Sequence, residues 1–478
     1  MHVETALGAL GSDPTRSLKI DFHRGEHHRR RSCASGVGLD GYAAARGDRR
    51  AAARSAPYAT MTTTTAPAPD RPITRADAHP TIDLAILGVA VVGAPEGAIG
   101  ITVADGLIVG FIHESESPPE HARLVDLRPH LLAPGTIDLH VHGGDGIDLA
   151  TTDDEGLAHF ATHRATTGTT GTLATIALPW DELIAQVARY GRWLETPHDA
   201  AISTVVGLHI EGPFLNARRK GALPPDCFRA PSRDDLDRLL DAGSGAVRMM
   251  TVAPELPGAL DLIERMVDRG VVASLGHSDA TFEQAIDGIH AGATKATHTF
   301  NAMRPFSHRD PGIIGAVLAN PSVVAELIAD GHHVHPGALA AAIRACGPDR
   351  VALVTDNVPQ AGLPEGVYRS GTYGDPPMVL RGGVARLADA DGNPTATISG
   401  SVGPIGAHLR VVRALPDQGI THDDAFAMAA TTPARVLGLT DRGRLAVGLR
   451  ADIAAWDPAT GTCVATIVGG DVVWRAPS

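Results

Sequence analysis

The sequence has few cysteines and no excess of positive charge. Its 478 residues include four cysteines, which lie far apart and form no C-x-x-C pair. So few cysteines provide no disulfide framework and are typical of a reducing compartment, so we expect a cytoplasmic protein. The formal net charge of −13 argues against nucleic acid as a partner, because proteins that bind nucleic acid present a basic surface.

Long apolar runs are also lacking. No stretch approaches the roughly 18 apolar residues that a membrane span requires, and the N-terminus has no apolar segment typical of a secretory signal. Residues 1–75 are of low complexity and include HRGEHHRRR and TTTTAPAPDRP. We expect this segment to be a disordered, dispensable tail. Met61, within it, is an alternative to Met1 as the start of translation.

Strand-like sequence occurs at both ends of the remaining chain. Residues 80–133 and 386–478 contain short apolar runs separated by Gly- and Asp-containing turns, such as GAIGITVADGLIVGF and GRLAVGLRADIAAW. Chain termini often lie close together in a domain. We therefore predict that these two segments form one small β-sandwich domain.

Residues 134–385 alternate short apolar strands with segments of helical spacing, among them DELIAQVARYGRWLE, RDDLDRLLDAG and ALDLIERMVDRG. This alternation predicts an α/β fold, a (β/α)₈ TIM-like barrel that serves as the catalytic domain. A doubly wound open sheet is the competing architecture, but no G-x-G-x-x-G turn supports it.

Potential metal ligands or proton carriers follow five of the apolar runs. They are His140, His142, Glu211, His277, His298 and Asp356. In a parallel barrel such positions lie at the carboxyl ends of the strands, where active sites are built. Four imidazoles and two carboxylates at this edge favour a divalent-metal hydrolase site. Asp356 is then expected to be the general acid/base, and the alternative is an N-cap at the start of the next helix. His209 is expected to contact the metal ligands without binding the metal itself.

The motifs PGTIDLHVHGG, GLHIEGPFLN, KGA, SLGHSDA, ATHTFNAM, IADGHHV, LVTDN and SGS occur in order along the chain. Together they resemble the N-acetylglucosamine-6-phosphate deacetylases of the amidohydrolase superfamily, from about residue 82 to residue 473. The resemblance implies hydrolysis of the acetamide of N-acetylglucosamine 6-phosphate in amino sugar catabolism. It also implies one or two divalent ions in each subunit, with Zn²⁺ preferred and Fe²⁺ as the alternative.

The same resemblance implies roles for individual residues. Glu211, His277 and His298 would hold the main metal, His140 and His142 a second one, and Asp356 would be the catalytic acid/base. The phosphorylated sugar would be bound at Ala222, Asn301, Ala302, Arg309, His333, Ser399, Gly400 and Ser401. Because Arg309 and His333 correspond to family positions that reach into the neighbouring subunit, a homodimer is implied.

The chain departs from the family pattern at Leu223, where the family usually has a histidine facing the acetyl carbonyl. Leucine cannot donate a hydrogen bond to this carbonyl. Either the metal alone polarises the carbonyl, or another group replaces the histidine, or the substrate differs from that of the family. The alternatives to the N-acetylglucosamine-6-phosphate deacetylase are an N-acetylgalactosamine-6-phosphate deacetylase, a cyclic amidase, or an inactive barrel acting as a scaffold or sensor. Glu211 argues against a cyclic amidase, because those enzymes usually bridge two metals with a carboxylated lysine.

Overall fold

The structure is a computed structural model that describes residues 81–199, 204–370, 374–415 and 418–477. The tail predicted for residues 1–75 lies outside the described residues. Within them, no helix combines the length and apolar character needed to cross a bilayer. The three described cysteines, Cys227, Cys346 and Cys463, are buried free thiols.

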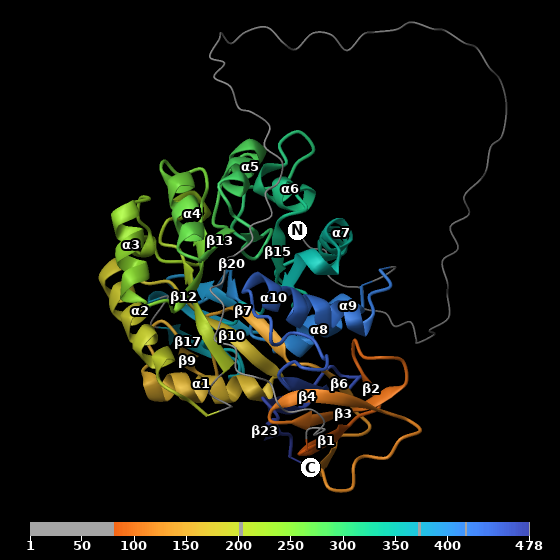
Figure 1. Ribbon diagram of the computed structural model, residues 1–478. Coiled ribbons are helices and arrows are strands. Elements are labelled where there is room, and N and C mark those ends of the chain that lie inside the picture. The colour runs from red at the N-terminus through yellow and green to blue at the C-terminus, as the bar shows by residue number, and fades with distance from the viewer. Residues whose placement is uncertain (1–80, 200–203, 371–373, 416–417, 478) are drawn as a thin grey trace, which may run out of the picture. The chain divides into compact units, whose positions relative to one another are not determined.

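Eight parallel strands form the central sheet and lie side by side in chain order (Figure 1). They are β7 (Thr136–Val141), β10 (Thr169–Ile176), β11 (Val205–Glu211), β12 (Val247–Val252), β13 (Val272–Leu275), β14 (Lys295–Ala296), β15 (Val324–Leu327) and β16 (Val351–Leu353). Nearly every residue of these strands is buried, as expected for parallel strands covered on both faces.

One helix follows each of the first seven strands. These are α1 (Asp154–Thr166), α2 (Trp180–Glu195), α3 (Arg233–Ala242), α4 (Ala259–Asp268), α5 (Phe282–His290), α6 (Gly312–Ala319) and α7 (Pro336–Cys346). Local sequence sets several of their starts. For example, Thr281 and Gln284 form a capping box at α5, which satisfies free amide groups at the helix N-terminus.

Contacts between β7, the first barrel strand, and the segment after β16, the last one, close the barrel. Val141 forms a parallel bridge with Asn357, and the Asp356 amide donates to the His140 carbonyl at 2.8 Å. Buried Asp138 accepts hydrogen bonds from the Thr355 backbone and hydroxyl. The predicted TIM-like barrel is therefore confirmed, and its seam passes directly beside His140 and Asp356.

Strands from the two ends of the chain share a sheet, as predicted. Its order is β2 (Ala90–Val91), β6 (Leu131–Pro134), β21 (Ile453–Trp456), β22 (Cys463–Val468) and β23 (Asp471–Arg475). A second sheet contains β4 (Leu107–His113), β3 (Ala98–Ala104), β1 (Leu84–Leu87) and β5 (Arg123–Asp126). Both sheets contribute to one apolar cluster, which includes Ile86, Ile101, Leu132, Ile453 and Ile467.

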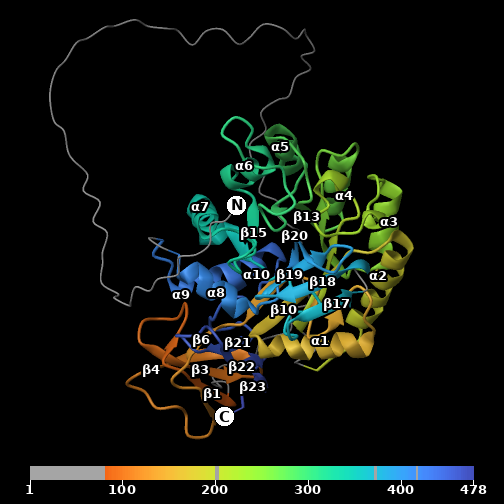
Figure 2. The same cartoon turned by 180° about the vertical axis from the view of Figure 1, so that it is seen from behind.

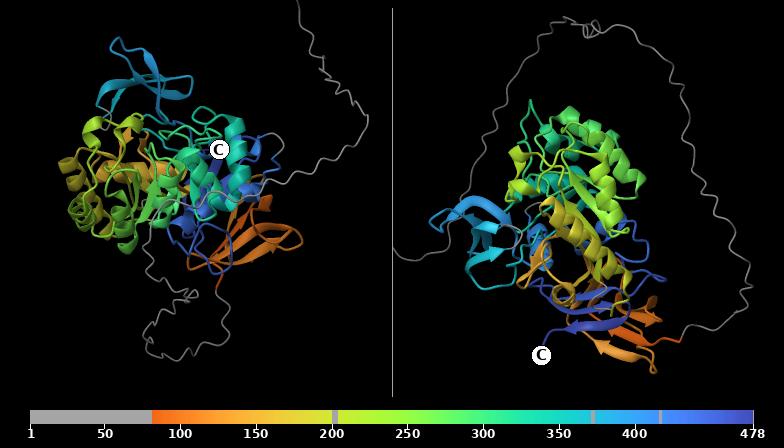
Figure 3. Two further views of the ribbon diagram at one scale, coloured as in Figure 1. Left: turned by 90° about the horizontal axis from the view of Figure 1, so that it is seen from above. Right: turned by 90° about the vertical axis from the view of Figure 1, so that its left-hand side faces the viewer.

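The segment after β16 differs from the expectation in two respects. The expected boundary at residue 385 falls inside β19 (Val384–Ala388), which belongs to a separate antiparallel sheet with β17 (Gly366–Ser370), β18 (Gly374–Arg381) and β20 (Pro394–Gly400). In Figure 2 this sheet lies in front of the barrel strands, and Figure 3 shows it projecting from one side of the barrel. The Gly382-Gly383 pair, both with positive φ, forms the two-residue turn between β18 and β19.

Helices occupy part of the segment that we assigned to the β-sandwich. They are α8 (Ile405–Arg413), α9 (His422–Phe426), the π-helical turn η5 (Ala427–Thr431) and α10 (Thr432–Val436). Ile405, Leu409 and Val412 are buried at the i, i+4, i+7 spacing of a helix face. That spacing was readable from the sequence. The limits of the domains stay a prediction.

Candidate metal centre and active site

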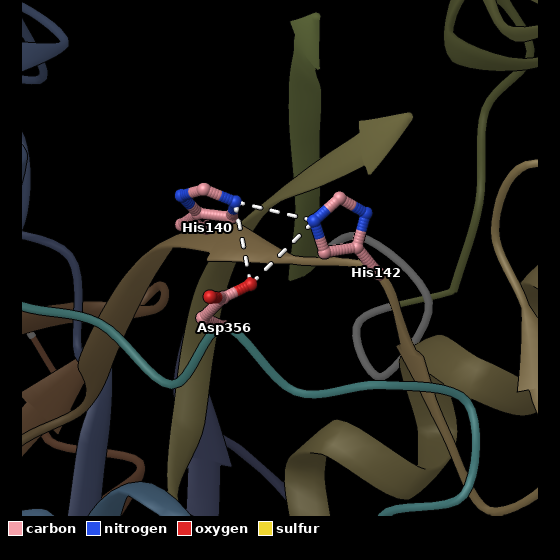
Figure 4. A group of neighbouring side chains, drawn as sticks. All are labelled: His140, His142 and Asp356. Atoms are coloured by element: carbon pink, nitrogen blue, oxygen red, sulfur yellow. Dashed lines mark hydrogen bonds and ion pairs between the residues drawn. The ribbon is translucent and has the colours of Figure 1, made fainter. Parts of the chain in front are cut away.

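The six predicted ligands and proton carriers lie at the carboxyl ends of barrel strands. His140 belongs to β7 and Glu211 ends β11, whereas His142, His277, His298 and Asp356 follow their strands by one to three residues. Figure 4 shows His140, His142 and Asp356 facing one another. All six are at most 8% exposed. The sequence therefore placed these residues on the correct edge of the barrel.

The backbone is strained at three of these positions. His277, His298 and Asp356 have φ values of 46°, 28° and 51°, in the left-handed region that side chains other than glycine rarely adopt. Such conformations cost on the order of 1–3 kcal/mol each and concentrate at functional sites. Here they direct side chains from three different strands toward one point.

Glu211 lies at the centre of the cluster. Its Oε1 is 3.0 Å from the Nε2 atoms of both His277 and His298, and those two nitrogens are 3.2 Å apart. Its Oε2 is 3.2 Å from the Nε2 of His142. Three histidines thus point the same ring nitrogen at one carboxylate.

His140 and Asp356 complete the group. The Nε2 atoms of His140 and His142 are 3.3 Å apart, and they lie 3.4 Å and 3.5 Å from Asp356 Oδ1 (Figure 4). The triplets His140–His142–Asp356 and His140–Glu211–His298 each have ligand atoms close enough to hold one metal ion.

The hydrogen bonds behind the rings test whether a cation fits. His277 Nδ1 is 2.7 Å from the Arg219 carbonyl, which can only accept, so Nδ1 must carry a proton. In a neutral ring Nε2 then presents a lone pair to Glu211, which also presents a lone pair. Two acceptors at 3.0 Å repel one another unless a positive charge lies between them. The buried cluster is therefore consistent with the divalent metal site of amidohydrolases.

Burial and neighbouring charges shift the pKa values of Glu211 and Asp356 in opposite directions. Burial would raise the pKa of Glu211, but His140 and His277 together with hydrogen bonds from His142 and His277 outweigh it and hold the pKa well below the usual value. The pKa of Asp356 is raised well above the usual value, first by burial and then by the charge of Glu211. Glu211 is suited to remain an anionic ligand, and Asp356 to carry a proton.

A cavity of about 260 Å³ opens over the cluster. Glu211, His142, His277, His298 and Asp356 line it, together with five predicted substrate-binding residues: Ala222, Asn301, Ala302, His333 and Ser399. Leu223 also lines it and is 3% exposed. Ala396 and Ile398 of β20 contribute to the same wall. The sheet that the sequence analysis did not foresee therefore covers part of the site.

Three predicted substrate-binding residues do not line this cavity. Arg309 is exposed on the loop before α6. Gly400 and Ser401 instead support Asp356: the Ser401 amide donates to the Asp356 carbonyl at 2.9 Å. A Cβ on Gly400 would lie 2.5 Å from that same carbonyl oxygen, so a side chain cannot be accommodated there.

The structure also shows site residues that sequence reasoning missed. Lys295 of β14 and Glu326 of β15 are fully buried and form an ion pair beside His140. Their signal in the sequence was a charge inside an otherwise apolar strand. His209, expected behind the ligands, is buried with its ring centroid 4.6 Å from that of His140, and its Nε2 lies 2.7 Å from the Thr251 hydroxyl.

Comparisons with known proteins agree with this geometry. Residues 131–473 match the model of the amidohydrolase family. The chain is 34% identical over 362 residues to an N-acetylglucosamine-6-phosphate deacetylase of Vibrio furnissii, covering 74% of this chain and 86% of the relative. It is also 34% identical over 359 residues to an N-acetylgalactosamine-6-phosphate deacetylase of Escherichia coli O157:H7, covering 75% of this chain and 90% of that protein.

Among solved structures, a mutant N-acetyl-D-glucosamine-6-phosphate deacetylase from Mycobacterium smegmatis, in complex with N-acetyl-D-glucosamine-6-phosphate, is similar. It matches with a TM-score of 0.73 and 33% identity, and the match covers 82% of this chain and 100% of that one.

Proposed function

The chain belongs to the amidohydrolase family, and we propose that it hydrolyses N-acetyl-D-glucosamine 6-phosphate to D-glucosamine 6-phosphate and acetate. The observation that carries this proposal is the cavity over Glu211, His277 and His298, with Asp356 at its wall. Related deacetylases that are about a third identical over most of their length support it. The reaction belongs to amino sugar catabolism, and we place the protein in the cytoplasm.

Glu211, His277 and His298 would hold the main divalent cation, because their donor atoms lie within 3.2 Å of one another. His140 and His142 would hold a second ion where one is present. Imidazole and carboxylate donors suit Zn²⁺, which we prefer, and also Fe²⁺. When bound, the cation lowers the pKa of a water molecule and polarises the amide carbonyl.

Asp356 moves the proton in this reaction. Its carboxylate accepts a proton from the attacking water as the oxygen bonds to the acetyl carbon, and it then donates that proton to the sugar nitrogen as the C–N bond breaks. The raised pKa of Asp356 suits this second step. Ser401 and Gly400 hold its backbone in place.

The remainder of the cavity would bind the phosphorylated sugar. His333 lines the cavity of its own chain, whereas the resemblance implied that it reaches into the neighbouring subunit. Its Nδ1 lies 2.7 Å from Asp330 Oδ2, which leaves Nε2 for the substrate. Arg309 is exposed and outside the cavity of its own chain. We propose a homodimer in which Arg309 reaches the phosphate bound by the neighbouring subunit.

N-acetylgalactosamine 6-phosphate is the second candidate substrate, because the chain is equally similar to a deacetylase that is named for it. The two sugars differ in configuration at one hydroxyl. Acetate release from both phosphorylated sugars, and from both unphosphorylated sugars, tests the proposal. Acetate release from neither phosphorylated sugar by the metal-loaded protein would refute it.

A further inference from the structure

We propose that Lys295 and Glu326 are positioning residues that fix the tautomer of His140 and the backbone of His298, and so set the affinity of the cluster for a divalent cation. This inference rests on the metal site of the proposed function, but not on the identity of the substrate.

Glu326 divides its two oxygens between different donors. Oε1 pairs with the Lys295 ammonium. Oε2 lies 2.9 Å from the His298 amide nitrogen and 3.3 Å from His140 Nδ1. One carboxylate therefore touches two of the predicted ligands, and the lysine holds it from the opposite side.

The tautomer of His140 follows from this arrangement. A carboxylate can only accept hydrogen bonds, so the proton of a neutral His140 ring lies on Nδ1. Its Nε2 lone pair then faces His142 and Asp356, as the orientation of the ring in Figure 4 shows. The opposite tautomer would direct an N–H into the cluster and remove one ligand.

The backbone of His298 needs the same support. Its φ of 28° is unfavourable for a residue with a side chain. The hydrogen bond from its amide to Glu326 is one of the contacts that oppose relaxation of this segment. A shift there would move the Nε2 of His298 away from Glu211.

A purely structural role explains this pair less well. Lys295 and Glu326 are each 0% exposed, and a buried ion pair is generally no more stabilising than well-packed apolar residues. Burial also lowers the pKa of Lys295, which is the cost of placing an ammonium here. Supporting partners behind metal-binding histidines, by contrast, typically change metal affinity 10–100-fold when they are removed.

Two variants separate the roles of charge and orientation. In Glu326→Gln, the Lys295 ammonium should donate to the oxygen of the new amide. The amide NH₂ would then face His140 Nδ1 and the His298 amide nitrogen, which are themselves hydrogen-bond donors. His140 must then change tautomer. In the double variant Lys295→Met with Glu326→Gln, no cation directs the amide, so its oxygen can turn back to His140 and His298.

Zinc affinity of the full-length protein, measured by competition with a chromophoric chelator after metal removal, is the main readout. We expect Glu326→Gln to weaken zinc binding at least about tenfold, and the double variant to recover most of that loss. Arg442→Met is the matched control, because Arg442 faces the buried carboxylate of Asp452 and neither residue lines the cavity over the cluster. This control can lose thermal stability but should bind zinc normally.

Equal zinc affinity in wild type and Glu326→Gln would overturn the proposal, as would a double variant no better than the single one. If the single variant does not fold, ¹⁵N chemical shifts of His140 in metal-free wild type decide instead. A proton on Nδ1 supports the proposal and a proton on Nε2 overturns it. Normal zinc binding without deacetylation would refute the proposed function and leave this inference intact.

Discussion

Replacing Asp356 with asparagine should separate proton transfer from metal binding. The donor atoms of the proposed main ligands, Glu211, His277 and His298, lie 3.0–3.2 Å apart, and none of these contacts involves Asp356. Asparagine has nearly the same shape, and the backbone hydrogen bonds of residue 356 to His140 and Ser401 do not involve its side chain. We therefore expect the variant to fold and to retain the main metal ion.

Turnover should nevertheless collapse, because an amide cannot accept and return a proton. General acid–base catalysis contributes about 10²–10⁴-fold to rates, which is roughly 3–5 kcal/mol of activation free energy. The assay is acetate release at saturating substrate, together with metal analysis of the same sample. Asp452→Asn is the control, since Asp452 is a buried carboxylate in the segment before β21, outside the cavity. A kcat of Asp356→Asn within about threefold of wild type would refute the proton-carrier role.

Three further predictions concern the ligands, the phosphate and the tail. Loss of any main ligand should remove metal and activity together, because three protein ligands define a catalytic site; the variants are Glu211→Gln, His277→Ala and His298→Ala. The variant His140→Ala should lose less activity. An equal, complete loss of activity in His140→Ala would show that a second ion is essential. Arg309→Ala should raise KM for the phosphorylated sugar strongly and change kcat far less. Heterodimers of an Arg309→Ala subunit with an Asp356→Asn subunit should regain some activity. No recovery in verified heterodimers would exclude a site shared between subunits. A chain that begins at Met61 should keep its fold and activity, so a large loss of either would show that the His/Arg-rich segment matters.

The barrel and the group of six predicted ligands and proton carriers could be predicted from the sequence, because both depend on local patterns of apolar and polar residues. An apolar strand followed by histidine or a carboxylate predicts a side chain at the carboxyl edge, and His140, Glu211 and Asp356 lie there. Their convergence follows from the parallel topology alone. The shared sheet of the N- and C-terminal segments, in which β6 pairs with β21, was predictable for a similar reason, since both segments carry strand patterns.

The remaining features depend on contacts that no local pattern specifies. Lys295 and Glu326 lie on neighbouring strands, and only the barrel register brings them together beside His140. β20 contributes Ala396, Ile398 and Ser399 to the wall of the cavity, whereas the boundary expected at residue 385 assigned these residues to the β-sandwich domain. Arg309 is exposed, and in the proposed homodimer its distance from the substrate would be set by the subunit interface.

The central proposal is that Glu211, His277 and His298 would hold the metal ion that this chain needs to hydrolyse the acetamide of a phosphorylated amino sugar. The most direct test measures acetate release from N-acetyl-D-glucosamine 6-phosphate by protein that has been stripped of metal and then reloaded with zinc, in parallel with Glu211→Gln. The account predicts no activity in the stripped protein, recovery on reloading in wild type, and no recovery in the variant. Full activity of the stripped protein, or recovery in Glu211→Gln, would contradict it.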